Sequence, residues 1–128
     1  GVVAVREQRK ILVGDDAGLI ITQCAEGLQA LGYTVSGAES GERVLERLRE
    51  ESFDLVLLDY RLPDIDGFEV FTRARALQPD LAFVLITGYG TTDVIDDATE
   101  LGFTTVLLKP FTRDQLRGAV ENALVTKG

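Results

Sequence analysis

The sequence predicts an α/β fold in which a parallel β-sheet is covered by helices on both faces. Five short apolar runs alternate with five segments of helical periodicity, and this alternation is typical of βαβ units. Most of the runs are apolar at nearly every position, as in strands that are buried on both faces. The chain has 128 residues, 45% of them hydrophobic, which suits one domain with one core. We therefore expect a single doubly wound domain.

The apolar runs define the expected strands. They cover 10–14, 33–38, 55–58, 81–86 and 105–108. The run 33–38 ("YTVSGA") is the most polar and is expected at an edge, whereas the other four are expected to be central in the sheet.

The expected helices are recognised by apolar stripes and by capping residues. The first helical pattern ends at Gly32 and the fourth carries its stripe over 94–101. Ser40 is the expected N-cap of the second helix. The other two helices begin at capping boxes: an acidic one, Asp66 with Glu69, opens the helix 67–77, and "TRDQ" at 112–115 opens the last helix, which runs to about Leu124.

Composition excludes several classes of protein. The net charge is −8, from 13 basic and 21 acidic residues, so no basic nucleic-acid footprint is expected. No apolar run approaches the roughly 20 residues of a membrane span. The chain has no histidine, which removes Ser-His and Cys-His pairs. The single cysteine, Cys24, falls in a helical apolar pattern and is expected in the core, which fits a reducing, cytoplasmic location.

Polar residues follow four of the five expected strands. Asp15 and Asp16 follow the first strand, Asp59 the third, Thr87 the fourth and Lys109 the fifth. The carboxyl ends of parallel strands lie at one edge of the sheet, where ligands of such folds bind. We therefore expect these five side chains to converge.

Three adjacent carboxylates repel one another unless a cation lies between them. Oxygen ligands without His or Cys favour Mg²⁺. Carboxylates also form aspartyl phosphates, and phosphoryl transfer needs mainly positioning and charge neutralisation. Asp59 is therefore the candidate phosphoryl acceptor and Lys109 the candidate counter-charge. The Thr87 hydroxyl would donate a hydrogen bond to the phosphoryl group. Gly88, which has no side chain, would let its backbone N–H come close to the same group.

Four segments of the sequence resemble the receiver domains of two-component response regulators. They are "LVGDD" (12–16), "LVLLDYRLPDIDG" (55–67), "LITGYG" (85–90) and "LLKPF" (107–111). The resemblance covers 10–124, which is taken as the receiver domain, preceded by a lead-in at 1–9 and followed by a tail at 125–128. It implies a flavodoxin-like (βα)5 fold with strand order 2-1-3-4-5.

The resemblance also implies how the site works. Asp59 would receive phosphate from a partner histidine kinase or phosphotransfer protein. Mg²⁺ would be held by Asp16, Asp59 and the backbone carbonyl of Arg61, with Asp15 acting through water. The peptide bond between Lys109 and Pro110 would be cis. Such a chain catalyses only its own phosphorylation and dephosphorylation and is not an enzyme in the usual sense.

One position departs from the family pattern. Most receivers have Tyr or Phe three residues before the lysine, as the partner of the threonine in the switch, and this chain has Val106. Tyr89 or Phe103 could replace that ring, and Tyr89 with Arg61 is expected to border the phosphorylation pocket. The surface that changes on phosphorylation, and that binds an output domain or downstream protein, is expected over 92–124.

Two other functions remain open. Val106 is compatible with a phosphate-independent interaction module that keeps the fold and lacks the chemistry. A haloacid dehalogenase-type phosphohydrolase also uses a strand-end aspartate and a lysine. That family needs a second carboxylate two residues after the nucleophile, however, where this chain has Arg61.

Overall fold

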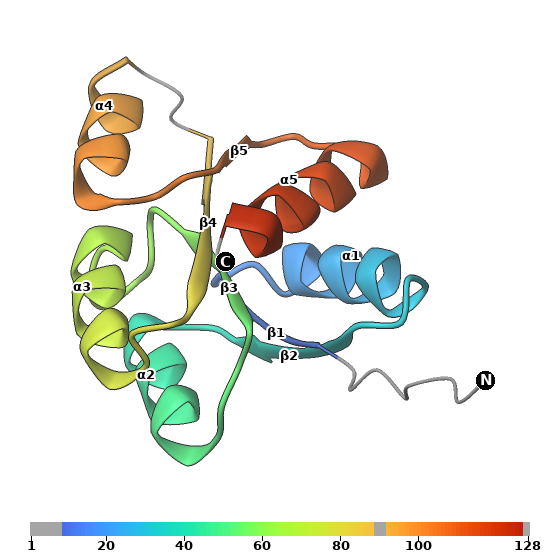
Figure 1. The fold of residues 1–128 in the computed structure, drawn as a ribbon, viewed down its shortest axis with the longest axis horizontal. Coiled ribbons are helices and arrows are strands. Elements are labelled where there is room, and N and C mark those ends of the chain that lie inside the picture. Colours follow the sequence, from blue (N-terminus) through green and yellow to red (C-terminus); the bar gives the residue numbers. More distant parts are fainter. Residues whose placement is uncertain (1–8, 89–91, 127–128) are drawn as a thin grey trace.

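The fold is a five-stranded parallel sheet with helices on both faces, as predicted (Figure 1). The computed structural model describes residues 9–88 and 92–126. The strand order is β2-β1-β3-β4-β5. The strands are β1 (Lys10–Gly14), β2 (Thr34–Ala38), β3 (Leu55–Asp59), β4 (Ala82–Thr87) and β5 (Val106–Leu108). The helices are α1 (Gly18–Gln29), α2 (Gly41–Glu50), α3 (Gly67–Leu77), α4 (Thr92–Leu101) and α5 (Arg113–Thr126).

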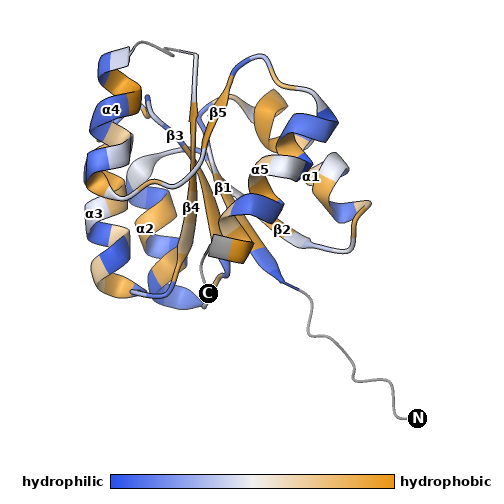
Figure 2. Ribbon diagram, turned by 45° about the horizontal axis from the view of Figure 1, so that its top comes forward, coloured by the Kyte–Doolittle hydropathy of each residue, from blue (hydrophilic) through white to orange (hydrophobic). Residues whose placement is uncertain are grey.

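The sheet separates two hydrophobic clusters. Alternate residues of a strand point to opposite faces, so Leu57 belongs to the cluster under α1 and α5, whereas Val56 and Leu58 belong to the cluster under α2, α3 and α4. The ribbon views show the same two layers, with apolar central strands between them (Figure 2). β3 is buried at all five positions, which makes it the rigid centre of the sheet.

Both edges of the sheet agree with the strand order that the family resemblance implied, but only one agrees with the apolar pattern of the runs. β2 is an edge strand, as its polarity predicted. The expectation that 105–108 is a central strand was wrong, because β5 lies at the opposite edge. Leu107 is buried, but Leu108 is 47% exposed. A run that is apolar on both faces can therefore form an edge strand when one of those faces remains open.

The predicted helix starts are confirmed by their hydrogen bonds. The Ser40 hydroxyl accepts from the N–H of Arg43 at 3.1 Å, and the Asp66 carboxylate accepts from the N–H of Glu69 at 2.9 Å. The 112–115 box is reciprocal, with bonds of 2.9 and 3.1 Å. Gly32 follows α1 with φ of +96°, a conformation that favours glycine. Local sequence therefore sets these boundaries.

No helix in the described part of the chain is both long and apolar enough to span a bilayer. Cys24 is fully buried in α1, as predicted. Burial, and secondarily the charge of Asp15, raises the pKa of the Cys24 thiol to about 12.

The Cys24 thiol is expected to be unreactive in the native protein. The thiolate is the reactive species, and both burial and the raised pKa oppose its formation. At pH 8 a chromogenic disulfide reagent should label the native chain far more slowly than the chain in denaturant. Equal rates in the two states would contradict the packing of α1 on the sheet.

Candidate functional site

The register of the strands brings the predicted site residues to one end of the sheet. Gly14 pairs with Leu58, so Asp15 follows β1 beside Asp59, the last residue of β3. Asp59 pairs in turn with Ile86, the residue before Thr87. The N–H of Lys109 donates to the Thr87 carbonyl at 2.9 Å, which brings the end of β5 to the same place.

Lys109 connects the two buried carboxylates. Its Nζ lies 2.9 Å from Oδ2 of Asp59 and 2.9 Å from Oδ2 of Asp15. Asp15, Asp59 and Thr87 are the buried polar or charged residues among those described, and all three lie at this end of the sheet. Burial of a charge is costly unless it is paired, so the ammonium makes both carboxylates tolerable inside the fold.

The environment of Asp59 favours a proton on its carboxyl group. Burial raises the pKa of Asp59 above its ordinary value, and the negative charge of Asp15 raises it further. Lys109 and the N–H of Arg61, which donates to Oδ1 at 3.0 Å, oppose this rise without cancelling it. Burial acts to lower the pKa of Lys109, but the two carboxylates outweigh it and raise that pKa. The site is thus rich in negative charge around one ammonium.

Three carboxylates at this edge can hold a metal ion. One oxygen from each of Asp15, Asp16 and Asp59 lies within 4.8 Å of the others. Oδ1 of Asp15 accepts from the N–H of Ala17 at 2.8 Å. Its buried Oδ2 has no hydrogen bond of good geometry in the described part of the chain, although Lys109 is close. An all-oxygen cluster with a poorly satisfied buried oxygen fits a hard divalent cation.

The chain that follows Asp59 turns tightly over the site. Gly67 N–H donates to the Tyr60 carbonyl at 2.9 Å and closes the loop 60–66. A Cβ at Gly67 would lie 2.7 Å from the Asp59 carbonyl oxygen, so this close approach requires glycine. The peptide bond between Lys109, the lysine of the site, and Pro110 is cis, as expected.

The residues expected to take part in a switch lie in different surroundings. Val106 is half-buried and packs against the cluster under α2, α3 and α4. Phe103 is 3% exposed, with its ring centroid 4.2 Å from that of Phe71. Gly88 is exposed at the end of β4. Tyr89 lies outside the described residues, so its expected place at the pocket border remains a prediction.

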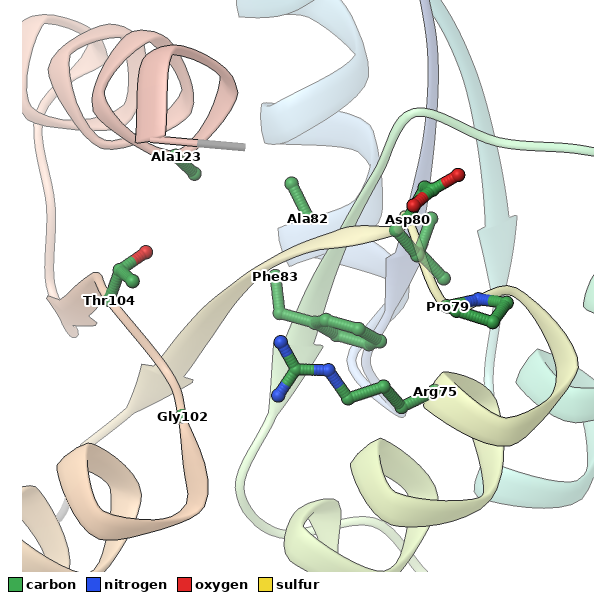
Figure 3. A pocket seen from close by; sticks show the side chains of 9 residues that line it. Arg75, Pro79, Asp80, Ala82, Phe83, Gly102, Thr104 and Ala123 are labelled. Atoms are coloured by element: carbon green, nitrogen blue, oxygen red, sulfur yellow. The ribbon is translucent and has the colours of Figure 1, made fainter. Parts of the chain in front are cut away.

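A cavity of about 170 Å³ lies far from this site, at the amino ends of the strands. Arg75, Asp80, Phe83 and Thr104 are among its lining residues (Figure 3). None of the predicted site residues lines it. The converging carboxylates, and not this cavity, therefore form the candidate functional site.

No pattern in the sequence indicates a role for Asp64, which lies in the loop that follows β3. Its Oδ1 accepts from the N–H of Gly41 and its Oδ2 from the N–H of Glu42, each at 2.8 Å. The partners are 23 and 22 residues away in sequence, and local capping patterns contain no signal for such a contact.

Comparison with known proteins agrees with this geometry. Residues 11–121 match the family described as "Response regulator receiver domain". The chain is 36% identical over 118 residues to sporulation initiation phosphotransferase F of Bacillus subtilis (strain 168), covering 92% of this chain and 95% of that protein. It is also 36% identical over 114 residues to the transcriptional regulatory protein ZraR of Escherichia coli (strain K12). That match covers 89% of this chain but only 26% of the longer relative.

Solved structures share the fold over nearly the whole chain. A CheY-like receiver domain protein from Methanospirillum hungatei JF-1 superposes with a TM-score of 0.88 at 26% identity, covering 94% of this chain and 97% of that one. A response regulator from Burkholderia pseudomallei, solved with a phosphorylated aspartic acid, a calcium ion and citrate, superposes with a TM-score of 0.83 at 25% identity, covering 93% and 70%. The strand order, the family match and these relatives together lead to one conclusion: the chain belongs to the response regulator receiver domains of two-component systems.

Proposed function

We propose that this receiver domain, taken as residues 10–124, accepts a phosphoryl group on Asp59 in a Mg²⁺-dependent reaction. The observation that carries the proposal is the buried Asp59 carboxylate, 2.9 Å from the Lys109 ammonium and within an acidic cluster of three aspartates. Such a site offers a nucleophile, a counter-charge and cation ligands at one point.

In the proposed step, a carboxylate oxygen of Asp59 attacks the phosphorus of a phosphohistidine in a partner. The new O–P bond forms as the N–P bond to the partner's imidazole breaks, and the bonding pair stays on that nitrogen. Asp59 must be ionised to attack, and Lys109 favours the ionised form. The ammonium is then placed to neutralise the phosphoryl oxygens.

Asp16, Asp59 and the backbone carbonyl of Arg61 would hold Mg²⁺, with Asp15 contributing through water. When bound, the cation would neutralise both the carboxylates and the incoming phosphoryl group. The chain itself contributes a rigid acceptor, because Asp59 ends a strand that is buried at every position. Its Oδ1 is further oriented by the Arg61 N–H.

Thr87 and Gly88 are proposed to bind the phosphoryl group from the end of β4. Thr87 is fully buried there, and its carbonyl is bonded to the N–H of Lys109. A shift of Thr87 toward the phosphoryl group would therefore displace the end of β5 through this hydrogen bond. Tyr89 is proposed as a neighbour of this pocket, and Arg61 as a residue that limits access of water to it.

The proposed donor is a histidine kinase or a phosphotransfer protein, as family membership implies. A relative named as a sporulation phosphotransferase and a neighbour solved with a phosphorylated aspartic acid support this chemistry. A cytoplasmic location fits the buried free thiol of Cys24.

The proposed output surface consists of α4, β5 and α5. The 47% exposed side chain of Leu108 supports it, as does a groove of about 470 Å³ over β5 and α5, lined in part by Leu108, Pro110 and Gln115. An output domain or a separate protein would bind there, because this surface adjoins the ends of β4 and β5 at the site.

Val106 favours one alternative, a module that binds its partner without phosphorylation. The usual aromatic side chain is absent from the position where the threonine switch needs it. The site itself retains its acidic cluster and its lysine, so phosphorylation remains the stronger proposal. The hydrolase alternative is weaker, since Arg61 occupies the place of the second carboxylate.

Incubation with Mg²⁺ and acetyl phosphate is expected to add one phosphoryl group per chain, measured by intact mass. Asp59→Asn should abolish the adduct, because the amide oxygen is a poor nucleophile. Asp80→Asn, which alters an exposed carboxylate at the other end of the sheet, should leave it unchanged. An adduct that persists in Asp59→Asn would place the acceptor elsewhere.

Asp59→Asn is also expected to stabilise the metal-free fold at pH 7. Because the pKa of Asp59 is raised in the folded state, its ionisation costs stability as the pH rises above the ordinary carboxyl pKa of about 3.9. Asparagine removes that cost, so the advantage should shrink as the pH is lowered toward 4. Thermal unfolding of both proteins in chelator, at several pH values, measures this difference in stability.

The exposed Asp80→Asn variant is the control for that measurement and should change stability by less than about 0.5 kcal/mol. An Asp59→Asn protein that is less stable than the parent chain at pH 7 would show that the Lys109 contact outweighs burial.

A further inference from the structure

We propose that Asp64 is a positioning residue for the phosphorylation site: it holds the loop 60–66, and with it the Arg61 backbone, against the first turn of α2. This inference rests on the proposed function, because it assigns Asp64 a role in the cation affinity of that same site. Asp64 itself would contact neither the cation nor the phosphoryl group.

The contact between the loop and α2 has two hydrogen bonds from one carboxylate. Oδ1 of Asp64 accepts from Gly41 N–H and Oδ2 from Glu42 N–H, both at 2.8 Å. Burial acts to raise the pKa of Asp64, but these N–H groups lower it below its ordinary value overall. A planar carboxylate held at both oxygens is fixed in orientation as well as in distance.

Side-chain packing also stabilises the contact between the loop 60–66 and α2. Ile65 is half-buried against the hydrophobic cluster. A Cβ at Gly41 would collide with Cγ1 of Ile65 and would lie 2.8 Å from Cγ2 of Val70. The backbone of α2 therefore approaches the loop as closely as glycine permits. The loop can move away from α2 only if it leaves this packing.

The position of Asp64 is coupled to Asp59 through a short piece of chain. The loop is closed at its base by the bond from Gly67 N–H to the Tyr60 carbonyl, 2.9 Å long. Within it, Arg61 lies three residues before Asp64 and donates its N–H to Oδ1 of Asp59 at 3.0 Å. Loss of the Asp64 contact should therefore loosen the Arg61 peptide and the carbonyl proposed to face the cation.

Capping of α2 is shared between two residues that accept from different N–H groups. Ser40 already caps the helix through the N–H of Arg43, at 3.1 Å. Ser40 and Asp64 both stabilise α2, but only Asp64 belongs to the loop that follows the acceptor strand. Substitution of Ser40 therefore changes helix stability alone, whereas substitution of Asp64 changes helix stability and loop position together.

The experiment compares Asp64→Ala and Asp64→Asn with Ser40→Ala in the full chain. The first measurement is the Mg²⁺ concentration that gives half-maximal phosphorylation by acetyl phosphate. Asp64→Ala should raise it on the order of ten-fold, as for residues that orient metal ligands, with the rate at saturating Mg²⁺ close to that of the parent chain. Asp64→Asn, which keeps one acceptor oxygen, should have a smaller effect, and Ser40→Ala should have none.

The second measurement needs neither metal nor phosphate. Hydrogen exchange of the Arg61 N–H, followed by NMR in chelator, should accelerate in Asp64→Ala, because local opening of the loop becomes easier, and remain unchanged in Ser40→Ala. An unchanged Arg61 amide, or equal effects of Ser40→Ala and Asp64→Ala on both measurements, would overturn the assignment. A parent chain that takes up no phosphate would instead overturn the proposed function, and the exchange data would still decide the role of Asp64.

Discussion

The contact of the Lys109 ammonium with the Asp15 and Asp59 carboxylates is the interaction on which the site depends. Its two distances of 2.9 Å join the ends of β1, β3 and β5. Removal of the ammonium would be costly, because the two carboxylates would stay desolvated and unpaired. The same crowding leaves Asp59 with a raised pKa and one oxygen of Asp15 poorly satisfied. The fold therefore tolerates this cluster without fully neutralising it, which is the electrostatic state expected of a cation site.

The scaffold around that cluster is fully buried on one side and lies at an edge of the sheet on the other. β3 is buried at every position and fixes Asp59, the proposed acceptor. The loop after it is closed by the Gly67 N–H and is held against α2 by Asp64. β5, by contrast, is a three-residue edge strand with Leu108 largely open to solvent. A site between a fixed strand and a lightly packed edge suits a switch, because a small charge change can bias the less constrained element.

Val106 bears on the proposed output of the chain and not on its proposed chemistry. The residues that would accept and neutralise a phosphoryl group are intact, whereas the aromatic partner of the threonine is replaced by a half-buried valine. Phe103 is too deeply packed among other aromatic rings to move as freely as an exposed ring. The backbone hydrogen bond between Lys109 and Thr87 would connect the site to β5 without any aromatic side chain.

The amino-acid order was enough to predict the strand alternation, the helix starts at Ser40, Asp66 and Thr112, and the five polar residues that converge at one edge. These follow from periodicity, from bonds within four residues, and from the rule that parallel strands end on the same side. The apolar pattern alone placed the fifth strand wrongly at the centre of the sheet, because apolar content does not reveal which face of a strand remains uncovered, whereas the strand order implied by the family resemblance placed it at an edge. Only the tertiary structure decided that Asp64 caps a helix whose first residue lies 23 positions earlier. That contact depends on how α2 and the loop after β3 pack together, and no local pattern encodes such packing.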